Sequence, residues 1–202
     1  MGYRLSCRAF PDGDCKIALD RNDESDFEIV SDYTGKQYDS GALKDTAFGI
    51  AIDIGTTTIA LNLVGKQSRE VVHSFSTINK QRSFGADVIS RIQASNDGKK
   101  EELKASIRQD LLTGIREILK ETGIASGQVE QVVIGCNTTM GHLLMGYSCE
   151  TLGVVPFTPV NIKMIKEPFE HILGEGLLDC EVVVLPGIST YVGGDIVSGM
   201  YF

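Results

Sequence analysis

Residues 48–64, FGIAIDIGTTTIALNLV, have the pattern of a strand, a tight turn and a second strand. An apolar run over residues 50–52 leads into Asp53, and Gly55 then interrupts the run. A β-favouring pattern resumes at Ile59 and continues to the end of the stretch. The pattern therefore predicts a β-hairpin whose turn carries an acidic residue, a glycine and three threonines.

The residue types in this turn suit the phosphates of a nucleotide. Gly55 lets backbone N–H groups approach an anion closely, and the hydroxyls of Thr56, Thr57 and Thr58 add hydrogen-bond donors. Asp53 cannot bind phosphate directly, because like charges repel, but it can hold a hydrated Mg²⁺ that bridges to phosphate. A turn of this kind also occurs in sheets that bind nothing. The turn alone therefore leaves phosphate binding and a plain hairpin as alternatives.

The length of the match favours phosphate binding. The whole run 48–64 resembles the first phosphate-binding hairpin of the ASKHA superfamily of ATPases, which contains actin, sugar kinases and Hsp70. It is not a P-loop, because the pattern GxxxxGK[ST] occurs nowhere in the chain. This resemblance implies an α/β fold of the ribonuclease H-like type, with a mixed sheet and flanking helices.

The composition excludes several classes of protein. Hydrophobic residues make up 42% and charged residues 23% of the 202 residues, which is ordinary for a globular protein. The formal net charge of −8 argues against general binding of nucleic acid or of an anionic membrane, since both need a basic face. No apolar run is long enough to span a bilayer, and the chain does not open with a leader peptide. The expected location is therefore the cytoplasm.

The five cysteines are odd in number and irregular in spacing. They predict neither a disulfide framework nor a self-contained zinc site. Most are expected to be small buried hydrophobic residues. They are Cys7, Cys15, Cys136, Cys149 and Cys180.

The first 20 residues predict two short strands around a PDG turn. Their run GYRLSCRAFPDGDCKIAL resembles the last hairpin of plant-type [2Fe–2S] ferredoxin domains, in which the residue matching Cys7 is the final cluster ligand. The other three ligands come from an upstream loop that this sequence lacks. We therefore expect residues 1–20 to be the end of a ferredoxin domain that binds no cluster in this chain alone. Residues 21–47 predict a polar linker, with one strand at residues 27–30.

The hairpin is followed by alternating strand and helix patterns. The clearest helix is expected at residues 100–121, where an apolar residue recurs every three or four positions and Gly123 ends the pattern. Strands are expected at residues 71–77, 129–135 and 181–185. The stretch between the last two, residues 147–180, predicts an excursion from the sheet. The apolar stripe of the long helix contains Leu103, Ile107, Leu111, Ile115 and Ile118.

Polar residues lie at two strand-to-helix junctions. Asn137 and Thr138 follow the second of these strands directly, where one of them caps the next helix and both lie at a carboxyl-end crevice of the kind in which open sheets bind ligands. His142 nearby is read as a core or surface residue rather than a ligand. Arg82, Asp87 and Arg91 suit either a pocket or a charged helix start.

The second junction holds Gly193, Gly194 and Asp195. Asp195 stands where a helix N-cap belongs, so capping explains it without any function. In the superfamily, an acidic or amide residue at this helix start faces the γ-phosphate and orients a water or an acceptor hydroxyl. We favour this second reading, with Asp195 and Asp53 as the catalytic pair and the two glycines beside the nucleotide.

Five stretches together resemble the ferredoxin-linked ATPases that reductively activate corrinoid proteins. They are the Cys7 hairpin, AIDIGTTTIALNLV, NKQRSFGADVISRI, VVIGCNTTMGHLLMGYSCETLGVVPFTP and VLPGISTYVGGDIVSG. The resemblance implies that ATP hydrolysis helps an electron pass from an iron–sulfur domain to the cobalt of a corrinoid protein. The implied cofactors of the full-length protein are ATP, Mg²⁺ and a [2Fe–2S] cluster. The implied partners are a corrinoid protein and an electron donor, with a homodimer left open.

The resemblance makes residues 48–202 the first half of an ATPase domain, because the superfamily forms the other wall of its nucleotide cleft from a second half. We expect this chain alone to be inactive. Two other functions remain open. One is a small-molecule kinase of the same superfamily, which the Cys7 hairpin disfavours because sugar kinases carry no ferredoxin. The other is a docking module for a corrinoid protein without catalysis, which the presence of Asp53, the threonines and Asp195 disfavours.

Overall fold

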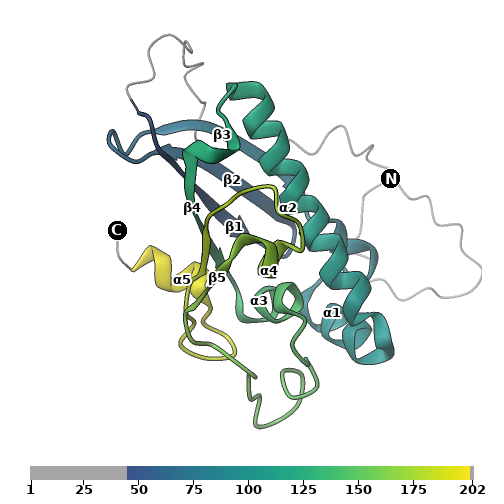
Figure 1. The fold of residues 1–202 in the computed structure, drawn as a ribbon. Coiled ribbons are helices and arrows are strands. Elements are labelled where there is room, and N and C mark those ends of the chain that lie inside the picture. Colours follow the sequence, from purple (N-terminus) through teal and green to yellow (C-terminus); the bar gives the residue numbers. More distant parts are fainter. Residues whose placement is uncertain (1–44, 201–202) are drawn as a thin grey trace, which may run out of the picture. The chain divides into compact units, whose positions relative to one another are not determined.

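The predicted hairpin is the centre of a mixed sheet. The computed structural model describes residues 45–200, in which β1 (Phe48–Ile54) pairs antiparallel with β2 (Thr58–Gly65). β3 (Val71–Ile78) extends the hairpin on the far side of β2, again antiparallel. The three strands thus form a meander on one half of the sheet (Figure 1).

The other half of the sheet is built from later parts of the chain. β4 (Val129–Cys136) lies parallel to β1, and β6 (Glu181–Val184) lies parallel to β4. β5 (Ile165–Pro168) closes this edge in the antiparallel sense, which gives the order β3-β2-β1-β4-β6-β5. Because β1, β4 and β6 are parallel, their carboxyl ends meet at one edge of the sheet.

The two faces of the hairpin differ sharply. Strand residues alternate between faces, and one face of β1 and β2 is fully apolar and buried. Its residues are Phe48, Ile50, Ile52, Ile54, Ile59, Leu61 and Leu63. The opposite face carries small or polar residues that are more open to solvent, among them Ala51, Asp53, Ala60 and Asn62.

The long helix α2 (Lys100–Thr122) covers the apolar face and crosses the strands of the meander (Figure 1). All five residues of its predicted stripe are fully buried. The approach is close at Gly114, where an added Cβ would lie 2.9 Å from the Phe75 ring and 3.0 Å from Leu61. Gly123 ends α2 with φ 70°, a left-handed conformation that glycine adopts without strain.

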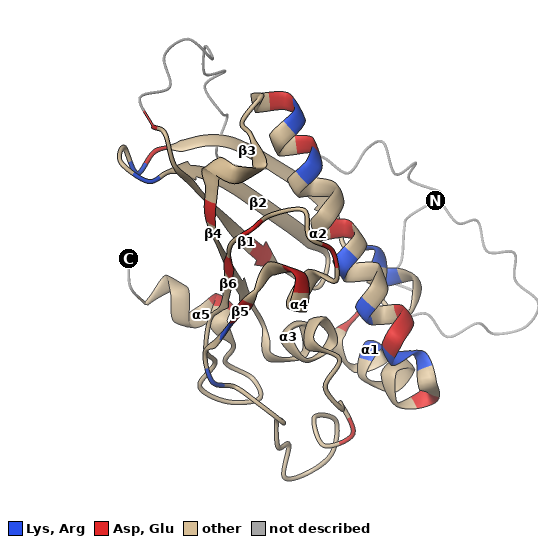
Figure 2. Ribbon diagram, in the orientation of Figure 1, with Lys and Arg blue, Asp and Glu red and all other residues tan. Residues whose placement is uncertain are grey.

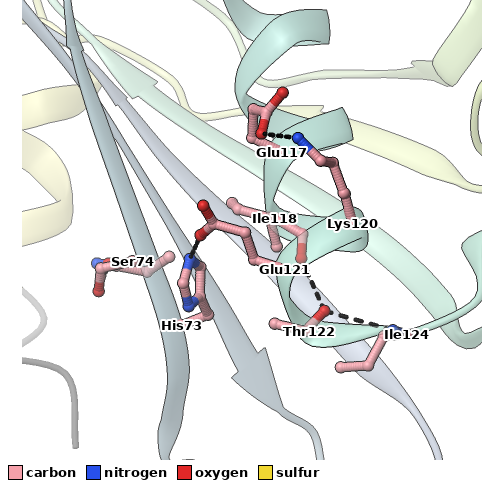
Figure 3. A network of polar contacts seen from close by, with 9 residues as sticks. His73, Ser74, Glu117, Ile118, Lys120, Glu121, Thr122 and Ile124 are labelled. Carbon is pink, nitrogen blue, oxygen red and sulfur yellow. Dashed lines mark hydrogen bonds and ion pairs between the residues drawn. The ribbon is translucent and has the colours of Figure 1, made fainter. Parts of the chain in front are cut away.

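Polar side chains on the exposed side of α2 and at its end make hydrogen bonds and ion pairs. Acidic and basic residues are interspersed along the length of α2 (Figure 2). His73 Nε2 on β3 lies 2.8 Å from Glu121 Oε2 on α2, and the Thr122 hydroxyl donates to the carbonyl of Ile118 one turn earlier (Figure 3). Exposed ion pairs of this type contribute little stability, so the apolar contact beneath them holds α2 in place.

The remaining helical segments are short. They are η3 (Lys80–Ser83), α1 (Val88–Ala94), η4 (Ser95–Lys99), η5 (Ser126–Gln128), α3 (Thr138–Met145), α4 (Phe169–Leu173) and α5 (Gly194–Gly199). α3 packs against α2 and α1, whereas α5 contacts β4. None of the helices in residues 45–200 is long and apolar enough to cross a membrane.

Most sequence predictions inside the described range are confirmed. The hairpin, the strands predicted at 71–77, 129–135 and 181–185, and the helix at 100–121 are present within one or two residues of the expected bounds. The excursion between β4 and β6 contains β5, a sheet strand that the sequence pattern did not predict. The Cys7 hairpin and the strand at residues 27–30 lie outside the described residues, as does most of the predicted linker.

Candidate functional site

The turn between β1 and β2 depends on Gly55. Its N–H donates to the carbonyl of Thr58 at 2.9 Å, and a Cβ on Gly55 would stand 2.8 Å from that same oxygen. Any larger residue would force the turn open. The sequence predicts that Gly55 lets backbone N–H groups approach an anion, but the N–H of Gly55 itself is used to close the turn.

All the carbonyl oxygens of this turn accept hydrogen bonds from groups within the protein. The Asn79 side-chain amide donates to Gly55 O at 2.9 Å, and the Asn79 N–H donates to Thr57 O at 2.9 Å. Arg91 Nη2 donates to Thr56 O at 2.6 Å. Within the described residues, the N–H groups of Thr56 and Thr57 donate to no protein atom. They are therefore the groups of the turn that can receive an anion.

Asn137 joins the turn to the start of α3. Its Oδ1 accepts from the N–H of Met140 at 2.9 Å, so Asn137 is the N-cap. Its Nδ2 donates to Thr56 Oγ1 at 3.3 Å across 81 positions of sequence. Thr58 belongs to β2, where it is paired with Ile78, and Thr57 is exposed. The three threonine hydroxyls thus have different surroundings rather than one shared role.

The residues after Asn137 are mostly structural. Thr138 Oγ1 donates to Ser189 O at 2.8 Å, which ties α3 to the loop before α5. His142 is buried: its Nδ1 donates to Thr138 O at 2.8 Å and its Nε2 accepts from Val160 N–H at 2.9 Å. Burial lowers the pKa of His142, partly offset by the bond to Thr138. Of the two places that the sequence left open for His142, core or surface, the structure shows the core.

Asp53 and Asp195 face a common hollow of about 340 Å³. Asp53 lies on the open face of β1, opposite Gly135 of β4. Loss of hydration raises the pKa of the Asp53 carboxyl, and repulsion from Asp195 raises it further. Two carboxylates sharing a hollow attract a cation, and a carboxylate pair with water and phosphate oxygens is the type of site that Mg²⁺ prefers.

Two glycines allow α5 to bring Asp195 to this position. A Cβ on Gly193 would lie 2.5 Å from Cys136 O and 2.6 Å from Asn137 Cα, and a Cβ on Gly194 would lie 2.9 Å from Leu185 O. The start of α5 therefore rests directly on the ends of β4 and β6. Both glycines lie in this backbone contact, next to the junction that also holds Asn137.

The expectation that Asp195 occupies the N-cap is wrong. Gly193 is the N-cap of α5, without a side-chain cap, and Asp195 is in the first turn. Among the described residues, its Oδ1 accepts one hydrogen bond, from the N–H of Ile196 at 2.9 Å. Because capping does not explain Asp195, its carboxylate is available to the hollow.

Cys136, at the end of β4, is not a reactive thiol. Burial raises its pKa to about 12, with further contributions from Asp195 and Asp53. A thiol with this pKa stays protonated at neutral pH. Cys136 and Cys149 are buried, as expected for small hydrophobic residues, while Cys180 is partly buried. Within residues 45–200, no three or more histidine, cysteine or acidic residues group as metal ligands.

The polar layer beneath the turn has no signature in the sequence. Asn79 and Gln81 are fully buried, although nothing in their spacing marks them. Arg91 was read as either pocket or surface and is neither, because it is fully buried under the turn. Asp87 caps α1 through Ser90, and Arg82 is exposed. The signal that would find these residues is contact with the turn, which appears only in the folded chain.

The fold and this junction define an α/β unit with a polar crevice at the carboxyl edge of a six-stranded mixed sheet. The chain belongs to the family described as the RACo middle region, whose sequence profile matches residues 48–202. This is consistent with the resemblance that the sequence motifs indicate.

Two relatives illustrate the similarity. A corrinoid activation enzyme, RamQ, from Eubacterium limosum is 35% identical over 112 residues, which are 54% of this chain and 19% of that protein. A solved structure named reductive activator for corrinoid,iron-sulfur protein superposes with a TM-score of 0.71 at 33% identity, over 78% of this chain and 25% of that one. This chain thus spans about a quarter or less of the length of these relatives.

Proposed function

We propose that this chain is the first half of the nucleotide-binding unit of an ATP-dependent reductive activator of corrinoid proteins. The names of both relatives support the corrinoid role, and their greater length supports a larger whole protein. In that whole, residues 1–20 are the end of a ferredoxin domain, residues 21–47 a linker and residues 48–202 the first part of the ATPase.

The sheet supports a ribonuclease H-like fold of the ASKHA type for residues 48–202. An antiparallel meander, β3-β2-β1, continues into the parallel strands β4 and β6, with the long β1–β2 hairpin at the centre. Helices α2 and α3 follow the meander and β4, and α5 begins after β6. In such a sheet the nucleotide lies at the carboxyl edge, where the turn 55–57 and the start of α5 are adjacent to β4.

The single observation that carries the nucleotide site is that Asp195 and Asp53, two residues before Gly55 of the turn, face the same hollow. The amides of Thr56 and Thr57 receive the phosphates, and Asp53 holds Mg²⁺ through water. Asp195 orients the water that attacks the γ-phosphorus, and the bond from that phosphorus to the β–γ bridging oxygen breaks. ATP and water thus give ADP and inorganic phosphate. Asn137, Thr138, Gly193 and Gly194 line a second cavity, which shares Leu185 with this hollow, and in this proposal they form the neighbouring wall of the nucleotide site.

The free energy of this hydrolysis drives the transfer of one electron to the corrinoid cobalt, which goes from Co(II) to Co(I). A [2Fe–2S] cluster, with Cys7 as one ligand in the longer protein, supplies that electron when bound. An external donor reduces the ferredoxin domain, and the partner is a cytoplasmic corrinoid protein. The residues described here take part only in nucleotide binding and hydrolysis.

Corrinoid-stimulated ATP hydrolysis tests the proposal. In the longer protein that contains this chain, phosphate release should rise when a Co(II) corrinoid protein is added, and Co(I) should appear in the visible spectrum. Asp53→Asn should abolish both, because the Mg²⁺ ligand is lost, whereas Glu150→Gln at an exposed position should change neither.

Absence of corrinoid stimulation in the wild type would contradict the proposal. Transfer of the γ-phosphate to a sugar or an acid would instead establish the kinase alternative. Corrinoid-protein binding without any nucleotide affinity would establish the docking module.

A further inference from the structure

Arg91 is the largest fully buried side chain in the described part of the molecule. It extends from α1 to the inner side of the turn between β1 and β2. Its Nη2 donates to Thr56 O at 2.6 Å, and its Nε donates to Gly85 O at 2.9 Å. One guanidinium therefore holds both the turn and the loop that precedes α1.

No carboxylate neutralises this buried charge. Besides the two carbonyls, Arg91 Nη1 lies 3.4 Å from Gln81 Oε1 and 3.4 Å from Met140 Sδ. Among residues 45–200, the groups that contact the Arg91 guanidinium are two carbonyls, an amide oxygen and a thioether, and none is acidic. Asp87 on the same helix exerts a Coulombic effect on the guanidinium, but its carboxylate bonds to Ser90. A buried charge without a paired partner is costly, so its presence needs a reason.

A neutral donor would be enough if the turn needed only a hydrogen bond. Asn79 shows this, since its amide satisfies Gly55 O without carrying any charge. Thr56 is the central residue of the turn, and its carbonyl instead accepts from the positively charged guanidinium of Arg91. A fixed positive charge on the inner side of an anion-accepting turn stabilises an anion on its outer side.

We propose that Arg91 is the positioning residue of the phosphate turn: it holds the Thr56 carbonyl inward, so that the Thr56 and Thr57 amides face the phosphate, and the bound phosphate balances its charge. Arg91 does not touch the nucleotide. This inference rests on the proposed function and adds to it a residue that lies beneath the site.

Three variants separate charge, hydrogen bonding and general packing. Arg91→Met removes the charge and both carbonyl bonds, whereas Arg91→Lys keeps the charge without the planar fork. The control is Arg108→Met on α2, because Arg108 is partly buried and, like Arg91, donates to a backbone carbonyl, His171 O, at 3.1 Å. Arg108 is not among the residues that contact the turn.

The measurements are the dissociation constant for Mg·ATP in the longer protein and the exchange rate of the Gly55 amide, which closes the turn. Arg91→Met should weaken Mg·ATP binding about ten- to hundredfold, the range for a lost hydrogen bond to a charged group. Arg91→Lys should weaken it about two- to tenfold, because the charge is kept but the planar fork is lost. Arg91→Met should also speed Gly55 exchange, while Arg108→Met should leave both quantities within about twofold of wild type.

The outcomes are distinguishable. A wild type without affinity for Mg·ATP overturns the proposed function and this inference together. A wild type that binds, with Arg91→Met binding equally well or with Arg108→Met losing as much affinity, overturns this inference alone. If Arg91→Met does not fold, Arg91→Lys becomes the test variant. An Arg91→Lys protein whose Mg·ATP affinity and Gly55 exchange rate both equal those of wild type would then overturn the positioning role.

Discussion

The two faces of the β1–β2 hairpin have opposite properties. The face toward α2 is a continuous apolar layer, in which Ile54 pairs with Ile59 and Ile52 with Leu61. The other face, offset by one residue in the same strands, carries Asp53 opposite Ala60 and Ala51 opposite Asn62. Because side chains alternate between the two faces of a strand, the residues that stabilise the fold lie on one face and the residues of the candidate site lie on the other. Changes on one face should affect folding, and changes on the other should affect the charge and binding of the hollow.

The largest effect is expected on the buried face. Leu61→Ala should lower the free energy of unfolding by about 3 kcal/mol, because it leaves a cavity beneath α2 near Gly114. The matched change on the open face, Ala51→Ser, should stay within about 0.5 kcal/mol of wild type. Urea unfolding followed by circular dichroism measures both. Equal effects would show that the two faces are not separated as described.

A smaller loss is expected where α5 meets the sheet. Gly193→Ala should cost about 1–3 kcal/mol, because the added methyl group overlaps the backbone at Cys136 and Asn137. The control is Gly127→Ala, where an added Cβ has no neighbour within 4 Å. The same unfolding measurement applies. A Gly193→Ala protein as stable as the Gly127→Ala protein would contradict the close contact.

The smallest effect, and the opposite sign, is expected for Asp53→Asn. The folded-state pKa of Asp53 is raised above 3.8, so the folded protein binds a proton there more tightly than the unfolded chain does. Stability is therefore lost as pH rises from about 3.8 through the folded-state pKa, and this cost remains at neutral pH. Asparagine removes it, at the same time as it removes the proposed Mg²⁺ ligand.

Asp53→Asn should thus raise the melting temperature at pH 7 by about 1–3 °C, an effect kept small by solvent screening. Below pH 3.8 the advantage over wild type should disappear. Calorimetry over this pH range measures it, with Glu150→Gln as the control acid. A variant that is less stable than wild type at pH 7 would contradict the raised pKa.

The sequence predicted the elements that have the longest regular hydrophobic patterns. Alternation marked β1 and β2, and the spacing from Leu103 to Ile118 marked α2, because those residues share one buried face. β5 was missed because only four residues form it, and three of them are exposed. A short edge strand is too short to show a hydrophobic period in the sequence. β5 is recognisable as a strand only from its pairing with β6.

The candidate site was predictable only where chemistry and local pattern coincide. Asp53 comes near the end of an apolar strand pattern, Gly55 interrupts that pattern, and Asp195 comes at the start of a helix pattern, so their places at the ends of these elements were expected. Asn79 and Arg91 were not, since they act through carbonyl groups of the turn more than 20 residues earlier in the chain. Backbone acceptors have no sequence signature, and a polar residue that binds one looks like any surface residue.

The contact between Gly193 and the end of β4 has one more consequence. It joins main chain to main chain, with no side chain between them. Main-chain atoms are common to all residue types, so exchanges of neighbouring side chains cannot lengthen or shorten this spacing. The distance between the backbone that carries Asp195 and the end of β4 is therefore set by main-chain contact, and it should survive changes of the surrounding side chains as long as position 193 has no Cβ.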